Sequence, residues 1–282
     1  MKFLTFYKTY YSHRVKKASI YLKYFFLLSL PLIYLLNKIL YPKVKNLENF
    51  ANKNTYLYEK DLGFLFQFFN SDKGEFFINQ YDKPLKSTKN LKTGHSYHKF
   101  YEKYFKPIKD QKLDILEIGS FKGNATAAFY FYFKKSQIIS CDIYPDFFLY
   151  NSNRIKHFKI DNSSESELNI NFLKKNINFD IIIEDAGHYF KDQIISLFML
   201  FRSLKPGGIF VVEELDFPDT RDDMNVFKEK PSLREILNSI NQNQDFSSKY
   251  ITNVQKEYFL NHFKDIKIFK GQFNEIAFIT KK

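Results

Sequence analysis

Cysteine is nearly absent from this sequence. Cys141 is the only one among 282 residues, so no intramolecular disulfide can form. The chain also lacks a Cys-x-x-Cys pair and any Cys/His cluster with zinc-ligand spacing. These absences exclude a disulfide-stapled scaffold and a structural zinc site, and they favour the cytoplasm as the compartment.

Acidic residues and glycine are also scarce. The chain has 43 Lys and Arg against 31 Asp and Glu, a formal charge of +12, and nine glycines. Clustered positive charge can bind nucleic acid, but here the basic residues are almost all lysines and are scattered. The chain is also rich in Asn, Ile, Phe and Tyr, which indicates a compositional bias and a solvated basic surface. We therefore do not expect nucleic acid as a partner.

Long apolar runs are absent except near the N-terminus. Residues 18–36 are apolar apart from Lys23 and a few small or hydroxylated residues, and they contain Pro31. Basic residues flank this run at Lys8, Arg14, Lys16, Lys17 and Lys38. Roughly 20 apolar residues can cross a bilayer as a helix. A single span with its basic flank inside, however, would export the C-terminal domain.

A helix lying on the membrane surface, or a re-entrant hairpin broken at Pro31, avoids that conflict. We expect this arrangement, which leaves the rest of the chain at the cytoplasmic face. The alternative is an apolar helix that packs on the C-terminal domain or on a second copy of the chain. The sequence thus divides into a membrane-associating segment at 1–41, a connector and helical lead-in or lid at 42–112, and a core at 113–282.

The core alternates between strand and helix patterns. Strands are predicted at 113–118, 137–142, 155–160, 180–184 and 208–213. Helices are predicted at 125–133 and 193–204, and a terminal hairpin at 266–269 and 276–279. The pattern predicts a Rossmann-like, doubly wound α/β fold. Its sheet is seven-stranded and mostly parallel, with a C-terminal antiparallel hairpin and an N-terminal apolar helical segment.

A glycine-containing loop follows the first strand of the core. It reads Glu117-x-Gly119-x-x-x-Gly123, without the three-glycine spacing that cradles a pyrophosphate. Ligands of open α/β sheets bind at the carboxyl ends of the strands. Asp142 ends the second strand, where a carboxylate can accept from ribose hydroxyls, and Asp161 ends the third, within reach of an adenine. A nucleoside ligand without phosphates is expected.

Carboxylates also end the next two strands. Asp185 follows the fourth strand, and Glu213 and Glu214 follow the fifth, so the fold brings like charges together. Such a cluster needs a cation or raised pKa values, and carboxylate oxygens suit Mg²⁺. His188, three residues after Asp185, could take a proton from a hydroxyl, because an imidazole titrates near neutral pH.

At these residues the sequence resembles the metal-dependent sugar O-methyltransferases of the macrocin and mycinamicin type, within the class I S-adenosylmethionine-dependent methyltransferases. The resemblance covers about residues 71–217. The motifs that carry it are Ser71-Asp72-Lys73-Gly74, His95-x-Tyr97-x-x-x-Tyr101-Glu102, Leu116-Glu117-Ile118-Gly119, Asp142-Ile143, Ile183-Glu184-Asp185-Ala186-Gly187-His188, Leu204-Lys205-Pro206-Gly207-Gly208 and Val212-Glu213-Glu214-Leu215.

The resemblance implies a methyl transfer from S-adenosylmethionine to a hydroxyl of a sugar or glycoconjugate, assisted by Mg²⁺. It matches Asp185, Glu213 and Glu214 with the metal ligands and His188 with the base. Glu214 stands where the family usually has aspartate. The resemblance also places Lys73, His95 and Tyr97 near the cofactor and its lid.

Two other functions stay open. One is an O-methyltransferase for a catechol-like or other small hydroxylated molecule, and the other is a non-catalytic, membrane-associated protein that binds the cofactor. The sequence leaves open whether the chain forms a homo-oligomer.

Overall fold

The structure is a computed structural model that describes residues 3–11, 15–16, 18–40, 44–78 and 91–282. At its centre is a seven-stranded sheet in the order β10-β11-β9-β8-β4-β5-β7. The strands are β4 (Asp114–Ile118), β5 (Gln137–Asp142), β7 (Ile155–Lys159), β8 (Phe179–Glu184), β9 (Leu204–Val212), β10 (Phe263–Lys270) and β11 (Glu275–Lys281). The first five run parallel, and β10 and β11 form an antiparallel hairpin whose second strand pairs with β9. The predicted sheet and its terminal hairpin are confirmed.

The parallel strands are apolar on both faces, as expected of a sheet covered by helices on both sides. Along β8, Ile181 and Ile183 face one core, whereas Ile182 faces the other. Because successive side chains of a strand point to opposite faces, one short run of isoleucines supplies both cores.

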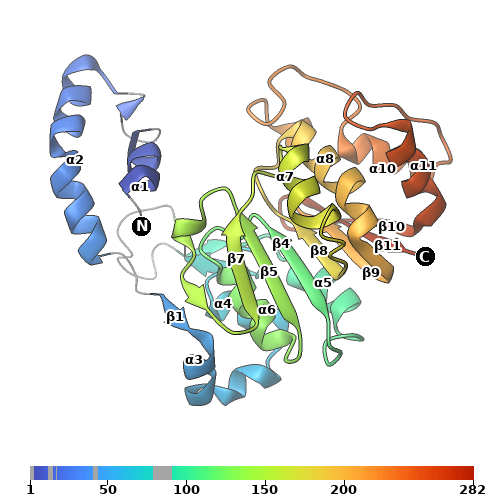
Figure 1. Ribbon diagram of the computed structural model, residues 1–282, viewed down its shortest axis with the longest axis horizontal. Helices are drawn as coiled ribbons and strands as arrows, with labels where there is room; N and C mark the ends of the chain where they lie inside the picture. Colours follow the sequence, from blue (N-terminus) through green and yellow to red (C-terminus); the bar gives the residue numbers. More distant parts are fainter. Residues whose placement is uncertain (1–2, 12–14, 17, 41–43, 79–90) are drawn as a thin grey trace.

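Helices cover each face of the sheet (Figure 1). The first core contains α3 (Leu47–Lys53), α4 (Leu62–Phe68), α5 (His98–Phe105) and α6 (Asn124–Tyr132). The second contains α7 (Glu165–Leu168), α8 (Phe190–Leu200), α10 (Leu233–Asn241) and α11 (Asn253–His262). The short helix α9 (Phe217–Thr220) follows β9. Because α4 and α5 pack in the same core as α6, these two helices belong to the packed body.

Aromatic side chains fill much of the first core. Phe66, Tyr101 and Phe129 contact one another at ring-centroid distances of 5.5 to 6.0 Å. All three are fully buried, and each such side chain contributes roughly 1.5 to 3 kcal/mol through burial. The phenylalanine-rich composition thus holds α4, α5 and α6 together.

The boundaries of α8 and β9 differ from the prediction. Helix α8 begins at Phe190, three residues before the predicted start, and β9 already begins at Leu204. Leu204 pairs with Phe179, and the register then shifts before Ile181 pairs with Ile209. An irregularity in the ladder therefore accommodates Pro206 and Gly207, which lie between the predicted helix and the predicted strand.

Two small strand pairs flank the body. β1 (Lys45–Asn46) pairs with β6 (Tyr150–Asn151), and β2 (Phe76–Ile78) pairs with β3 (Leu91–Thr93). Residues 79–90, within the predicted lid, lie outside the described residues.

The N-terminal segment forms a helical hairpin of α1 (Phe3–Tyr10) and α2 (Ile20–Leu40), which lies beside the body in Figure 1. Phe3 and Phe6 of α1 contact Tyr34 of α2. Within the part of the chain that the structure describes, no helix combines the length and the apolarity needed to cross a membrane. Arg14 and Lys17 of the predicted basic flank, and residues 41–43 around the predicted segment boundary, lie outside the described residues.

Candidate functional site

A cavity of about 760 Å³ opens at the carboxyl ends of the parallel strands. Most of the residues predicted for the site line it, and they are Lys73, His95, Glu117, Gly119, Asp142, Asp161, Asp185, His188 and Glu214. Tyr97, Gly123 and Glu213 are not among the lining residues. The fold therefore brings residues from Lys73 to Glu214 to a single cavity.

The loop after β4 approaches Asp185 very closely. Gly119 has φ +91°, and a Cβ at this position would lie 1.9 Å from the backbone oxygen of Asp185. Gly123 has φ +79° immediately before α6, where a Cβ would meet the ring of Phe148 at 2.4 Å. Only glycine fits both places, because it accepts a positive φ and has no Cβ. Gly119 lines the cavity, whereas Gly123 sets the direction of α6.

Asp142 and Asp161 occupy the strand ends expected for a nucleoside site. Asp142 accepts backbone N–H groups of Phe121 at 2.8 Å and of Tyr144 at 2.7 Å, one on each carboxylate oxygen. Asp161 accepts from the backbone N–H and the hydroxyl of Ser163 on its Oδ1. Each oxygen of Asp142 has a second lone pair, and Asp161 has its second oxygen, Oδ2, so both side chains can still accept from a ligand.

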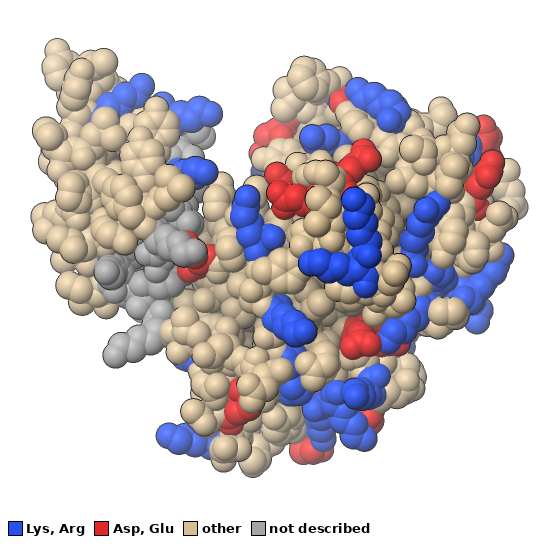
Figure 2. All heavy atoms as spheres, in the orientation of Figure 1, with Lys and Arg blue, Asp and Glu red and all other residues tan. Residues whose placement is uncertain are grey.

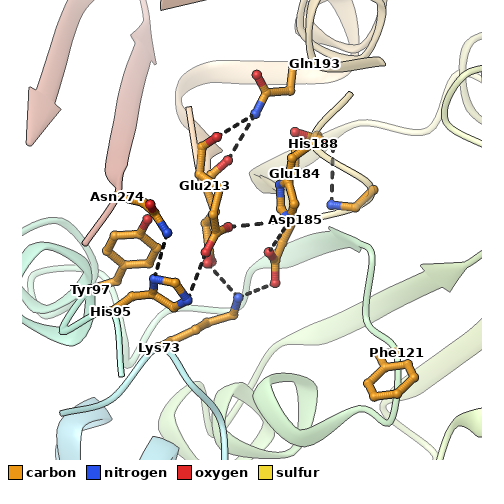
Figure 3. A network of polar contacts seen from close by, with 12 residues as sticks. Lys73, His95, Tyr97, Phe121, Glu184, Asp185, His188, Gln193, Glu213 and Asn274 are labelled. Carbon is orange, nitrogen blue, oxygen red and sulfur yellow. Dashed lines mark hydrogen bonds and ion pairs between the residues drawn. The ribbon is translucent and has the colours of Figure 1, made fainter. Parts of the chain in front are cut away.

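A buried lysine holds two of the predicted metal ligands. The Lys73 ammonium donates to Asp185 and, at 2.7 Å, to Glu213 (Figure 3). Tyr101 donates to the other oxygen of Glu213. Burial raises the pKa of Asp185 to about 7 and that of Glu213 to about 8. Burial opposes the charge of Lys73, but Asp185 and Glu213 outweigh it and raise the lysine pKa, so Lys73 is the charged member of the cluster.

His95 contacts one oxygen of Glu214, and His188 faces the other. Asn274, in the turn of the terminal hairpin, lies 3.2 Å from Nδ1 of His95, and an amide nitrogen can only donate there. The imidazole hydrogen is then on Nε2, which lies 3.2 Å from Oε1 of Glu214. Tyr97 stacks on His95 and donates to the backbone oxygen of Glu275. In this structure Tyr97 therefore supports His95 and does not reach the cavity.

His188 faces the same carboxylates. Its Nε2 lies 3.8 Å from Oδ1 of Asp185 and 3.6 Å from Oε2 of Glu214, which is too long for hydrogen bonds. Both its Nδ1 and Oε2 of Glu214 are buried without a hydrogen-bond partner among the described residues. Burial, followed by the charge of Lys73, lowers the pKa of His188 to about 3, so the imidazole is neutral.

The backbone is strained at two of these residues. His188 has φ +55° and Glu214 has φ +45°, values that residues with a Cβ rarely adopt. The side-chain amide of Gln193 in α8 donates to the backbone oxygens of both Glu213 and Glu214 at 3.2 Å and so holds the turn after β9 (Figure 3). Strained backbone of this kind gathers at functional sites, where the surrounding packing compensates for its cost.

Ligand atoms for a cation come together at one point. Asp185, His188 and Glu214 each offer an atom within 4.8 Å of the others, among the described residues. Glu213, the third ligand predicted from sequence, instead directs its carboxylate to Lys73 and Tyr101. The geometry thus offers Asp185 and Glu214 as the oxygen pair, with Glu213 behind them.

Glu117, a buried carboxyl in the cavity wall, has a stability contribution that depends on pH and can be tested. It is 1% exposed and accepts the hydroxyl hydrogen of Thr126. Burial raises its pKa from the ordinary 4.5 to about 7. Because the folded-state pKa lies above the ordinary value, Glu117 favours folding while it is protonated. This contribution is lost as the pH rises from 4.5 through about 7.

We expect Glu117→Gln to remove this loss of stability. One pKa unit corresponds to about 1.4 kcal/mol, so the variant should gain up to about 3 kcal/mol over the wild type between pH 4.5 and pH 8. Thermal unfolding at several pH values measures the difference. Glu257→Gln, at an exposed carboxyl of α11, is the control and should show a constant difference. A pH-independent difference for Glu117→Gln would contradict the assignment.

Several residues of the site could not be assigned a role from sequence. The spacing of Tyr101, one helical turn after Tyr97, indicated that both lie on one face of a helix. It could not indicate the partner of Tyr101, because Glu213 is 112 residues away. Asn274 lies 179 residues from His95 and carries no local pattern. Gln193 was predicted only as the start of a helix.

The strand order and the position of the cavity define the class I methyltransferase fold, the class that the motifs resemble. No protein-family model matches the chain.

Two curated relatives are similar to it. A tetracenomycin rhamnosyl 2'-O-methyltransferase of Streptomyces olivaceus is 29% identical over 43% of this chain and 33% of its own length. The mycinamicin VI 2''-O-methyltransferase of Micromonospora griseorubida is 26% identical over 43% of this chain and 32% of its own length.

The chain thus matches about a third of the length of these relatives. Among solved structures, the methyltransferase MycE of the mycinamycin pathway, in complex with Mg and S-adenosylhomocysteine, superposes with a TM-score of 0.58 at 19% identity. The match covers 79% of this chain and 55% of MycE. This likeness shows the fold, and the curated relatives confirm the resemblance to sugar O-methyltransferases.

Proposed function

We propose that the protein transfers a methyl group from S-adenosylmethionine to a hydroxyl of a sugar or glycoconjugate. The observation that carries this proposal is the position of His188. A neutral imidazole faces two carboxylates in the cavity that the Gly119 loop borders. The curated relatives support the reaction class, since both are named as O-methyltransferases of sugars.

The reaction needs a deprotonated hydroxyl. In the transfer the bond between sulfur and the methyl carbon breaks and a bond from the acceptor oxygen to that carbon forms. S-adenosylhomocysteine leaves, and the hydroxyl proton passes to Nε2 of His188. A neutral imidazole can take this proton, and burial keeps His188 neutral. Burial raises the pKa values of Asp185 and Glu214, so their carboxylates, at 3.8 and 3.6 Å, would stabilise the imidazolium only when they are ionised, as at higher pH or with a cation bound.

The residues present fit a divalent cation. Among the residues that the structure describes, Oε2 of Glu214 is buried without a hydrogen-bond partner, and ligand atoms of Glu214 and Asp185 lie within 4.8 Å of each other. Mg²⁺ prefers such oxygen ligands to imidazole nitrogen, so Asp185 and Glu214 would hold it and His188 would stay free as a base. The ion would lower the pKa of a bound hydroxyl.

We expect removal of either carboxylate to weaken cation binding. Asp185→Asn and Glu214→Gln keep the side-chain shape but remove a charged ligand, and each should weaken Mn²⁺ binding by at least about tenfold. Titration calorimetry with Mn²⁺ on the full chain measures this. Asp265→Asn, at a half-exposed carboxyl of β10 that pairs with Lys267, is the matched control and should bind as the wild type does. If the wild type and the three variants all bound Mn²⁺ with equal affinity, the proposed cation site would be refuted.

Transfer of a labelled methyl group from S-adenosylmethionine to saccharides and to catechols tests which class of acceptor the protein uses. We expect a chelator-sensitive transfer to saccharides, with the products identified by mass spectrometry. Transfer to a catechol but to no saccharide would favour the small-molecule alternative. Absence of S-adenosylhomocysteine binding in calorimetry would refute both enzymatic functions and leave the non-catalytic one.

We also propose that the α1–α2 hairpin attaches the protein to the cytoplasmic face of an anionic membrane. Large apolar side chains of α2 point to solvent, among them Tyr21 and Leu28, which are 85% and 83% exposed. Figure 2 shows this hairpin as mostly uncharged surface with a few lysines, whereas the face of the body shown there carries scattered charge. Apolar side chains with lysines beside them suit the boundary between lipid head groups and acyl chains.

Vesicle sedimentation of the full chain tests this attachment. We expect binding to vesicles that contain phosphatidylglycerol and weaker binding to pure phosphatidylcholine. The double variant Tyr21→Glu/Leu28→Glu should bind at least about tenfold less, because two apolar side chains no longer enter the lipid. The control Val226→Glu/Phe227→Glu changes two exposed apolar residues of the body and should bind the vesicles as the wild type does. If the hairpin variant instead abolishes a dimer in light scattering, the hairpin binds a second copy of the chain.

A further inference from the structure

Arg221 is a cation in the cavity wall that neither the base nor the metal site uses. It directly follows α9 and lines the cavity together with Phe217 and Met224. Among the described residues, the other lysines or arginines of the lining are Lys73 and Lys122. Lys73 holds the acidic cluster, and Lys122 lies in the loop after β4. Arg221 therefore brings positive charge to a different part of the cavity.

Backbone hydrogen bonds fix the position of Arg221. Its N–H donates to the backbone oxygen of Phe217 at 2.9 Å, and its own backbone oxygen accepts from Met224 at 3.0 Å. The backbone oxygen of Met224 accepts from Phe190, the first residue of α8, at 3.0 Å. The turn is thus tied to both α9 and α8, and a charge that is already in place loses little entropy when a ligand binds.

The guanidinium lies close to the base. Its central carbon is 4.7 Å from the ring centroid of Phe217, and that ring lies edge-on to the imidazole of His188 at 5.3 Å. One aromatic ring therefore separates the guanidinium from the imidazole. Burial lowers the pKa of His188 most, and the positive charge of Arg221 adds to this decrease.

Part of the guanidinium remains available to a ligand. Nε and Nη2 donate to the two carboxylate oxygens of Asp223 at 3.2 and 2.8 Å, and this aspartate is itself 66% exposed. Among the described residues, none accepts from Nη1 of Arg221. A guanidinium carries five N–H donors, so the edge formed by Nη1 and Nη2 can still bind an oxyanion. The two parallel N–H groups of such an edge match the oxygens of a carboxylate or a phosphate.

The strand order places Arg221 on the acceptor side of the base. The proposed donor lies near Gly119 and Asp142, at the carboxyl ends of β4 and β5. His188 follows β8 and Arg221 follows β9, which lie in the opposite direction along the sheet. The acceptor hydroxyl must reach His188 from the side that the donor leaves open. The rest of the acceptor then lies toward β9, beside Arg221.

We propose that the acceptor is an acidic saccharide, and that Arg221 binds its carboxylate or phosphate through Nη1 and Nη2. This inference rests on the proposed function and deepens it, because it names the class of saccharide. Tyr189, which lines the cavity and is 50% exposed, offers a flat apolar surface for a sugar ring. Arg221 thus determines acceptor specificity, whereas His188 takes the proton.

Transfer of a labelled methyl group to matched saccharides tests the proposal. The probes are methyl glycosides of glucose, galactose and mannose whose sixth carbon carries a hydroxyl, a carboxylate or a phosphate. We expect kcat/KM for one acidic series to exceed that of its neutral parent by at least about tenfold, because a bidentate ion pair adds to binding. The carboxylate and phosphate series distinguish a uronate from a sugar phosphate.

Variants of Arg221 assign the preference to its side chain. Arg221→Gln should reduce the preference to about twofold or less by raising KM for the acidic acceptors, with kcat unchanged within about threefold, because glutamine carries no charge. Arg221→Lys keeps the charge but loses the fork, so it should retain part of the preference. Arg202→Gln, between α8 and β9 and outside the cavity lining, is the matched control and should keep the wild-type ratio.

The outcomes separate this inference from the proposed function. If the wild type methylates no saccharide, the proposed function fails, and the inference fails with it. If the wild type methylates neutral saccharides at least as well as acidic ones, the role of Arg221 alone is refuted, whatever the stability of the variants. An acidic preference that persists unchanged in Arg221→Gln also refutes that role.

Discussion

Replacing His188 by asparagine is expected to lower kcat at least about 1,000-fold, with the affinity for S-adenosylhomocysteine unchanged within about twofold. A general base contributes roughly 10² to 10⁴ in rate, and asparagine cannot take up the hydroxyl proton. Asparagine is preferred to alanine here because His188 has φ +55°, a conformation that asparagine tolerates well. A loss of activity in this variant therefore measures the loss of the general base and not a distortion of the loop.

Steady-state kinetics and calorimetry together measure this effect. His262→Asn, in α11 and away from the cavity lining, is the control and should keep its activity. A variant at position 188 with a near wild-type rate would refute the base. Equal losses of rate and of donor affinity would instead indicate a structural role for the imidazole.

The second large effect is expected for Gly119→Ala. A Cβ at Gly119 would lie 1.9 Å from the backbone oxygen of Asp185, so either the loop after β4 or the end of β8 must move. We expect the free energy of unfolding to fall by about 3 kcal/mol or more and S-adenosylhomocysteine binding to be lost, because overpacking adds to the backbone strain. Denaturant unfolding and calorimetry check the two effects.

Gly207→Ala is the matched control for this variant. Gly207 also has a positive φ, +75°, but no atom lies within 4 Å of an added Cβ. The control therefore measures the strain of the left-handed conformation alone, about 1 to 2 kcal/mol. If both variants lost the same stability and both still bound the ligand, the close approach of the Gly119 loop to Asp185 would not matter for the site.

The strands were predictable because their signal is local. A run such as Ile181 to Ile183 is apolar on both faces only in a covered sheet, and β5 was predicted with its observed bounds. The boundaries of α8 and β9 were less predictable, because the irregular pairing of Leu204 with Phe179 depends on the neighbouring strand. The helical lead-in was predicted, and α5 lies within it, but its packing against α6 depends on aromatic contacts between segments that are distant in the chain.

The sequence by itself determined which residues stand at the strand ends, and thereby most of the cavity wall. Asp142 ends a strand, and Gly119, Asp185 and Glu214 follow strands, in an order that the α/β pattern implies. Their partners were decided by the tertiary structure. Lys73 is 112 residues from Asp185 and 140 from Glu213, and only packing brings its ammonium between them.

The tertiary structure also decided the orientation of the acidic side chains Glu213 and Glu214. Sequence placed Glu213 and Glu214 together as ligands, but neighbouring residues of an extended chain point to opposite sides. In the structure Glu213 turns to Lys73 and Tyr101, whereas Glu214, with its positive φ, turns to His95 and His188. Side-chain direction depends on backbone conformation and on partners that lie far away in the chain, so the spacing of residues could predict an acidic site but not how its charges are balanced.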